Sequence, residues 1–182
     1  HVEKDTTNTL ADDTTGQADF GTTVTVADKA GTIEGFAYDS DTGDITIAVS
    51  GNEATIYYVR NSYNVTYYVD GSQSDNAEPY AFEAPVTLRS EPSRDGYTFD
   101  GWYTNSSCTG TRAENFNMPA EDVNLYGKFT ANTDTPYVVE FYLQNDDGST
   151  YPTTASATDP RTGTTDTMAY VTAADKADRE NG

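Results

Sequence analysis

The side chains that could act in catalysis are few in this sequence. His1 is the only histidine and Cys108 is the only cysteine, whereas nucleophilic catalysis needs a nucleophile, a base and an orienting group together. One histidine and one cysteine also cannot supply the usual nitrogen and sulfur ligands of a zinc site. The sequence has 30 aspartate and glutamate residues, but nothing singles out two of them as the carboxylate pair of a glycosidase. We therefore predict that the chain is not an enzyme.

Calcium is the one ion for which the sequence offers candidate ligands. Asp39, Asp41 and Asp44 lie in one turn that also contains Gly43, and hard oxygen ligands on a flexible loop suit Ca²⁺. The turn begins like an EF-hand loop, but Ser50 stands where that loop carries its bidentate glutamate. A solvated turn, in which the aspartate side chains bond the local backbone, explains the same residues. Both interpretations stay open.

Aromatic side chains are the candidates for ligand binding. Around the only tryptophan, Trp102, the rings of Tyr97, Phe99 and Tyr103 alternate and would share one face of a short strand. Trp102 would then point to the other face, unless Gly101 forms a bulge. Such rings predict a small core, but exposed rings would make a platform on which a glycan can stack. The candidate platform residues are Trp102, Tyr103, Tyr57 and Tyr58.

Composition and charge exclude two classes of partner. The net charge of −20 arises from 30 acidic and 10 basic residues, and such a surface repels phosphate backbones and anionic headgroups. We therefore expect no nucleic acid and no membrane as partners. The sequence shows no signal peptide, transmembrane stretch or wall-sorting tail. If the protein is secreted, we expect this sequence to be an internal segment of a longer chain.

The elements that must position these residues are predicted to be strands, because valine, threonine and tyrosine dominate the periodic runs. Strands are expected at residues 63–69 and 137–143, and a hairpin from residues 45–49 and 54–59. Pro85 should split the strand region 80–89 or place it at a sheet edge. Helix signals are limited to one turn at Pro119–Asp122 and to Ala173–Arg179.

An internal repeat divides the chain. Residues 24–30, Val-Thr-Val-Ala-Asp-Lys-Ala, align without a gap with residues 171–177, Val-Thr-Ala-Ala-Asp-Lys-Ala. Copies of one module type therefore lie at both ends, with a different module between them. We predict modules at residues 1–61, 62–131 and 132–182, the third of them truncated, in a tandem, elongated array.

The central module carries a specific resemblance. Residues 92–104, Pro-Ser-Arg-Asp-Gly-Tyr-Thr-Phe-Asp-Gly-Trp-Tyr-Thr, precede residues 118–129, Met-Pro-Ala-Glu-Asp-Val-Asn-Leu-Tyr-Gly-Lys-Phe. These two blocks, in this order, make the sequence from residue 63 to residue 130 resemble the Listeria–Bacteroides repeat, the B-repeat type of internalin surface proteins. The resemblance implies a β-grasp, ubiquitin-like module of extracellular bacterial proteins. Gly127 stands where this family usually has alanine.

The flanking modules resemble MucBP (mucin-binding-protein) repeats. The residues that carry this resemblance are those at positions 137–148, 21–26, 34–38 and 55–59. MucBP modules are also β-grasp-like and occur in tandem on wall-anchored proteins of Gram-positive bacteria. The resemblance implies host mucin or another glycoprotein as a binding partner, and neighbouring repeats of the same longer chain as contacts.

Together these features predict mainly β modules of the small α+β, β-grasp type. The resemblances imply a non-catalytic repeat region of a bacterial cell-surface adhesin, extracellular and anchored to the cell wall through a part outside this sequence. It would act as a stalk or spacer and could also bind mucin. The alternative is a carbohydrate-binding accessory module of a secreted glycan-degrading enzyme. That alternative requires exposed aromatic rings, whereas the spacer requires buried ones.

Overall fold

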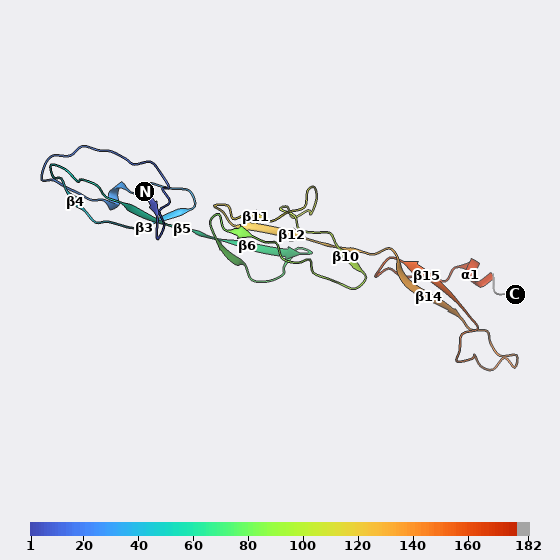
Figure 1. Ribbon diagram of the computed structural model, residues 1–182. Coiled ribbons are helices and arrows are strands. Elements are labelled where there is room, and N and C mark those ends of the chain that lie inside the picture. Colours follow the sequence, from blue (N-terminus) through green and yellow to red (C-terminus); the bar gives the residue numbers. More distant parts are fainter. Residues whose placement is uncertain (178–182) are drawn as a thin grey trace. The chain divides into compact units, whose positions relative to one another are not determined.

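The computed structural model describes residues 1–177 and confirms a mainly β fold with many small sheets (Figure 1). In chain order the elements are β1 (Val2–Glu3), β2 (Thr23–Val24), the 3₁₀ helix η1 (Ala27–Lys29), β3 (Phe36–Asp41), β4 (Ile45–Thr46), β5 (Ile56–Arg60), β6 (Ser62–Val69), β7 (Ser72–Gln73), β8 (Glu78–Ala81), β9 (Pro85–Val86), β10 (Tyr97–Phe99), β11 (Phe116–Asn117), β12 (Val123–Gly127), β13 (Phe129–Ala131), β14 (Thr135–Phe141), β15 (Ala157–Gly163) and α1 (Ala173–Ala177).

Helix is almost absent from the described residues. The prediction of a helical turn at Pro119–Asp122 is wrong, because the backbone there only bends before β12 begins. The helix predicted at Ala173–Arg179 is present as α1 up to Ala177, and its last two residues lie outside the described part of the chain. In residues 1–177 no helix is long and apolar enough to cross a membrane.

The chain divides into two compact units. The first contains residues 1–89 and 102–126, and the second contains residues 90–101 and the chain from residue 127 onward. The central segment 62–131 therefore contributes to both units. The module boundaries near residues 61 and 131 stay predictions.

The first unit contains a three-stranded sheet in the order β1-β5-β3. β5 lies in the middle, parallel to β1 and antiparallel to β3. Alternate residues of β5, Ile56 and Tyr58, are buried and form a core cluster with Val26. The partly buried apolar residues packed against this cluster are Leu10, Ala30, Ile33, Phe36 and Ile45.

The hairpin predicted from residues 45–49 and 54–59 is wrong. β4 pairs instead with β2, whereas β5 pairs with β1 and β3. The side chain of Asn52 bonds both the N–H and the carbonyl of Ala48 at 2.8 Å, which closes a local loop where the hairpin ladder would have continued. Val49 is 92% exposed, so burial does not hold the end of this segment in a strand.

The same unit contains a second sheet built around β6, which pairs with β12 on one side and with β7 and β8 along different parts of its length. The strand predicted at residues 63–69 is confirmed as β6. The predicted break at Pro85 is also confirmed, because β8 ends at Ala81 and β9 starts at Pro85 and pairs with β11. The buried side chains of this part are Val65, Tyr67, Val86, Trp102, Tyr103, Cys108, Met118 and Leu125.

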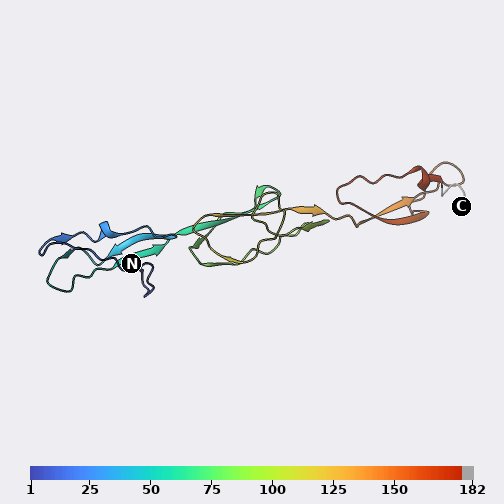
Figure 2. The ribbon, with the colours of Figure 1, turned by 90° about the horizontal axis from the view of Figure 1, so that it is seen from above.

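The second unit contains two pairs of strands and the helix α1. β10 is antiparallel to β13, and β14 is antiparallel to β15 along seven residues of each strand. Figure 2 shows the β14–β15 pair in orange and red. The strand predicted at residues 137–143 is confirmed as β14, which begins and ends two residues earlier. β15 was not predicted.

Candidate functional site

The four candidate platform residues do not form one exposed face. Trp102 and Tyr103 are each only 6% exposed and Tyr58 only 1%, whereas Tyr57 is half-buried. Tyr57 and Tyr58 are neighbours on β5, so their rings point to opposite faces of that strand. Trp102 and Tyr103 belong to the part of the unit built around β6. This placement favours the core interpretation of the rings, and glycan binding by them stays a prediction.

The ring of Trp102 makes a hydrogen bond and an edge-to-face ring contact. Its indole N–H donates to the backbone carbonyl of Arg89 at 3.1 Å, and its ring meets Tyr67 edge to face with centroids 4.8 Å apart. The backbone makes this position, because β10 ends at Phe99 and Gly101 has a φ of +89°. The left-handed backbone at Gly101 breaks the strand alternation, so Trp102 and Tyr103 are both buried.

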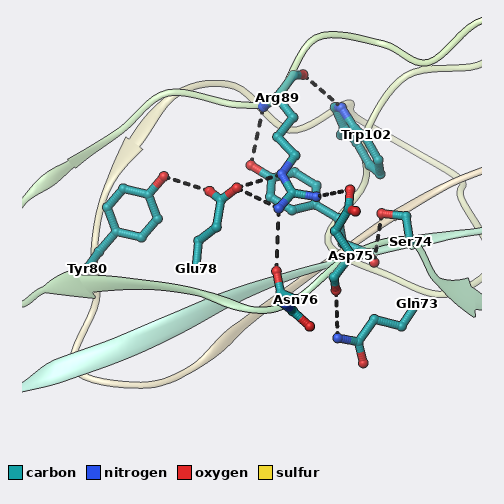
Figure 3. Close-up of polar contacts among 9 residues, drawn as sticks. Gln73, Ser74, Asp75, Asn76, Glu78, Tyr80, Arg89 and Trp102 are labelled. Carbon is teal, nitrogen blue, oxygen red and sulfur yellow. Dashed lines mark hydrogen bonds and ion pairs between the residues drawn. The ribbon is translucent and has the colours of Figure 1, made fainter.

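A polar cluster surrounds the Arg89 guanidinium (Figure 3). The guanidinium carbon lies 4.6 Å from the ring centroid of Tyr67. Nε donates to Glu78 at 2.7 Å and Nη1 donates to Asp75 at 2.8 Å. Nη2 donates to the carbonyl of Asn76 at 3.4 Å. Arg89 therefore ties the loop between β7 and β8 to the aromatic core through charge-assisted bonds and a cation–π contact.

The cluster shifts the titration of its members in the directions that these contacts require. Hydrogen bonds from Arg89 hold the pKa of the Glu78 carboxyl below its ordinary value, and the hydroxyl of Tyr80, 2.9 Å away, contributes as well. Burial raises the pKa of the Tyr80 hydroxyl, and its bond to the carboxylate adds to this. The cluster contains one cation, Arg89, together with carboxylates and phenols, but no nucleophile paired with a base. Its arrangement is that of a structural bracket.

Replacing Arg89 with glutamine should raise the pKa of Glu78 toward 4.5, the ordinary value of a glutamate carboxyl. The hydrogen bonds that favour the ionised Glu78 carboxylate would be lost. In the wild type these bonds stabilise the fold above the ordinary pKa of Glu78, and that stabilisation is lost as pH falls through the lowered pKa. In Arg89→Gln this contribution to stability would disappear. Carboxyl ¹³C NMR titration measures this directly. Lys29→Gln removes the same charge from η1 and should leave the Glu78 titration unchanged; an unmoved pKa in Arg89→Gln would contradict the pairing.

The three candidate calcium ligands each bond other groups. Asp39 pairs with Lys4 at 2.8 Å, and Asp41 accepts from the Gly43 N–H at 2.6 Å. Asp44 accepts from the N–H of Val26 at 3.1 Å. Among residues 1–177 no group of three or more histidine, cysteine, aspartate or glutamate side chains could hold a metal ion. The local turn accounts for the bonds observed, and calcium binding stays a prediction.

Sequence reasoning did not find the arginine clusters. Besides Arg89, Arg60 binds Glu3 and Glu83. Arg161 binds Asp159 and Asp175. Nothing local marks these pairs, because most partners lie more than ten positions apart. The only feature of the sequence that could have indicated these clusters was the scarcity of basic residues, because each arginine then pairs with several acidic side chains.

Comparison with known proteins identifies the central part of the chain. Residues 63–128 match the family model of the Listeria-Bacteroides repeat domain. This confirms the resemblance for that segment, which contains the β6 sheet, the Trp102 core and the Arg89 cluster. We call residues 63–128 the repeat domain and residues 1–61 the N-terminal segment from here on.

A curated protein is also similar. The chain is 35% identical over 107 residues to Internalin H of Listeria monocytogenes serovar 1/2a (strain ATCC BAA-679 / EGD-e). The similarity covers 52% of this chain and 18% of the length of Internalin H.

Proposed function

We propose that the chain is a non-catalytic repeat region of a Gram-positive cell-surface adhesin, in which it acts as a spacer between other parts of the protein. The repeat domain and the similarity to Internalin H support a place in a bacterial surface protein. The aromatic rings expected of a glycan platform are mostly buried, as a spacer requires. The repeated Val24–Ala30 and Val171–Ala177 stretches support two flanking segments, 1–61 and 132–182, of one module type, which would be MucBP-like.

The observation that carries the spacer proposal is the connection between the N-terminal segment and the repeat domain. Only Asn61 separates β5 from β6. Its N–H donates to the carbonyl of Gly35 at 2.8 Å, and its carbonyl accepts from the N–H of Phe82 at 2.8 Å. The linking residue is therefore bonded on both sides, to one segment before it and one after it. Such a link has none of the freedom of a Gly/Ser-rich linker.

Antibodies against the folded chain should label intact cells of the source bacterium, and trypsin treatment of those cells should remove the label. Labelling only after permeabilisation would contradict the surface location.

In a glycan and mucin array the wild-type chain should show no saturable binding. Saturable binding that Tyr57→Ala abolishes and Tyr170→Ala preserves would replace the spacer by an adhesive module, because Tyr57 is a candidate platform residue and Tyr170 is an exposed tyrosine outside the candidate set.

A further inference from the structure

A turn of the repeat domain is bound to the N-terminal segment by its side chains as well as by the Asn61 link. The turn lies between β8 and β9 and carries Phe82 and Glu83. The residues that meet it are Arg60 at the end of β5 and Gly35 just before β3. All of them belong to the first compact unit. We call this set of four residues the clasp.

Arg60 bonds to Glu3 of the N-terminal segment and to the turn of the repeat domain at once. Its Nε donates to Glu3 at 2.5 Å and its Nη2 to the other oxygen of the same carboxylate at 3.2 Å. Its Nη1 donates to the Phe82 carbonyl at 2.9 Å and to Glu83 at 2.6 Å. The two-pronged pair with Glu3 fixes the plane of the guanidinium. The guanidinium therefore presents Nη1 to the turn in one orientation.

The ring of Phe82 occupies space that only a glycine leaves open. A Cβ atom at Gly35 would lie 2.2 Å from the Phe82 ring. The ring also meets Phe36 edge to face, with centroids 5.7 Å apart, and Arg60 covers Phe36 at 5.1 Å. Because these groups are closely packed, a movement of the turn relative to β3 would break the van der Waals contacts of the Phe82 ring.

The turn is equally well fixed to the repeat domain. The N–H of Glu83 donates to the carbonyl of Met118 at 2.8 Å, and Met118 is buried. The N–H of Ala84 closes the turn onto Ala81 at 3.0 Å. A force on the turn is therefore transmitted to the buried residues of the repeat domain, so the clasp couples the repeat domain to the N-terminal segment.

A similar contact occurs within the second unit, where a glycine of the repeat domain is covered by a side chain from beyond it. A Cβ atom at Gly96 would lie 2.7 Å from the Thr165 side chain, and the Thr165 hydroxyl donates to the Gly96 carbonyl at 2.7 Å. Next to it the Tyr97 hydroxyl donates to Asp166 at 2.5 Å. The repeat domain therefore makes a close glycine contact with each flanking segment: Phe82 packs on Gly35 of the N-terminal segment, and Thr165 packs on Gly96 of the repeat domain.

We propose that the clasp fixes the orientation of the repeat domain relative to the N-terminal segment. The Phe82 ring packs directly against Gly35, and the ion pairs of Arg60 hold it there; we call these ion pairs the ionic lock. This goes beyond the proposed function, because it concerns the orientation of two adjacent segments whether or not the chain is displayed on a cell. Loss of the clasp would leave the Asn61 link, about which the two segments would reorient.

Residual dipolar couplings of backbone amides in the full chain test the clasp. The wild-type chain should fit one alignment tensor for residues 1–61 together with residues 63–89 and 102–126, the part of the repeat domain that lies in the same compact unit. Gly35→Ala should give two different tensors, because its Cβ displaces the Phe82 ring. Gly51→Ala is the matched control, since Gly51 has the same φ of +76° and no atom within 4 Å of its Cβ; it should keep one tensor. Two tensors in the wild type, or one in Gly35→Ala, would overturn the proposal.

A second variant keeps the test decisive if Gly35→Ala unfolds the N-terminal segment. Phe82→Ala removes the ring from the turn without adding an atom anywhere, and it should also give two tensors. Phe20→Ala, at an exposed phenylalanine, should keep one. A single tensor in Phe82→Ala would overturn the proposal on its own.

The lock also has an expected pH range. Arg60 faces Glu3 and Glu83, and Glu3 faces Arg60 and Asn8. The bonds from Arg60, and then the bond from Asn8, hold the pKa of Glu3 below its ordinary value. The negative charge of Glu3, which stabilises the ion pair, is present above the ordinary pKa of a glutamate and is lost only as pH falls through the lowered pKa of Glu3. The wild type should keep one tensor from about pH 7 to about pH 5, and a split in that range would contradict the ionic lock.

Discussion

Replacing Trp102 with alanine is expected to lower the free energy of unfolding of the repeat domain by about 3–5 kcal/mol, the usual cost of removing a large buried aromatic ring. The ring is almost fully buried, fills the space beside Tyr67 and donates to the Arg89 carbonyl. Its removal leaves a cavity and an unsatisfied carbonyl together. Urea unfolding followed by far-UV circular dichroism measures the loss, because the variant has no tryptophan to report by fluorescence.

Two further variants separate the contributions. Trp102→Phe keeps much of the ring but leaves the Arg89 carbonyl without its donor, and we expect a smaller loss of about 1–3 kcal/mol. Tyr170→Ala changes an exposed ring and should stay within about 0.5 kcal/mol of the wild type. A Trp102→Ala chain as stable as the Tyr170→Ala chain would show that Trp102 is not a core residue, and the glycan platform would then regain its support.

Replacing Gly127 with alanine should destabilise the chain by about 1–3 kcal/mol, the typical cost of overpacking a filled core. The added Cβ would lie 2.1 Å from the end of the Phe99 ring. That ring is buried and meets Phe129 with centroids 5.2 Å apart, so it has no room to withdraw. The midpoint of urea unfolding, again by circular dichroism, is the measurement.

A smaller partner should restore the stability. Phe99→Leu shortens the side chain that the new methyl group strikes, so the double variant Phe99→Leu, Gly127→Ala should be more stable than the sum of its single variants predicts. Gly31→Ala adds the same methyl group where no atom lies within 4 Å and serves as the control. Strict additivity in the double variant would mean that the two side chains do not compete for one space.

Apolar alternation predicted the strands whose buried face is made of large side chains. β6 buries Val65 and Tyr67 in alternation, and its bounds were predicted to within one residue. β15 shows the opposite case. Its sequence, Ala-Thr-Asp-Pro-Arg-Thr-Gly, has no apolar period, and its inner face is held by the Arg161 ion pairs and by β14. Polar strands of this kind are defined by their partner, which the local sequence does not show.

The aromatic site was predictable as a set of rings but not as a geometry. The alternation rule placed Trp102 opposite Tyr103, with a bulge at Gly101 as the exception, and the positive φ of Gly101 is what buries both rings. The Arg89 cluster could not be found, because Asp75 and Glu78 reach Arg89 across a loop and two strands. Charge pairs at such separations depend on tertiary packing alone.

The parallel pairing of β1 with β5 determines how the N-terminal segment resists tension. A pull on the N-terminal end of β1 and on the C-terminal end of β5, where Asn61 leads into β6, drags two parallel strands past each other. The load is then carried in shear by several bonds at the same time. These are the backbone hydrogen bonds between β1 and β5, the bond from the Lys4 N–H to the Tyr58 carbonyl, and the ion pair of Glu3 with Arg60. Antiparallel strands peeled from one end would lose their bonds one by one, at a lower force.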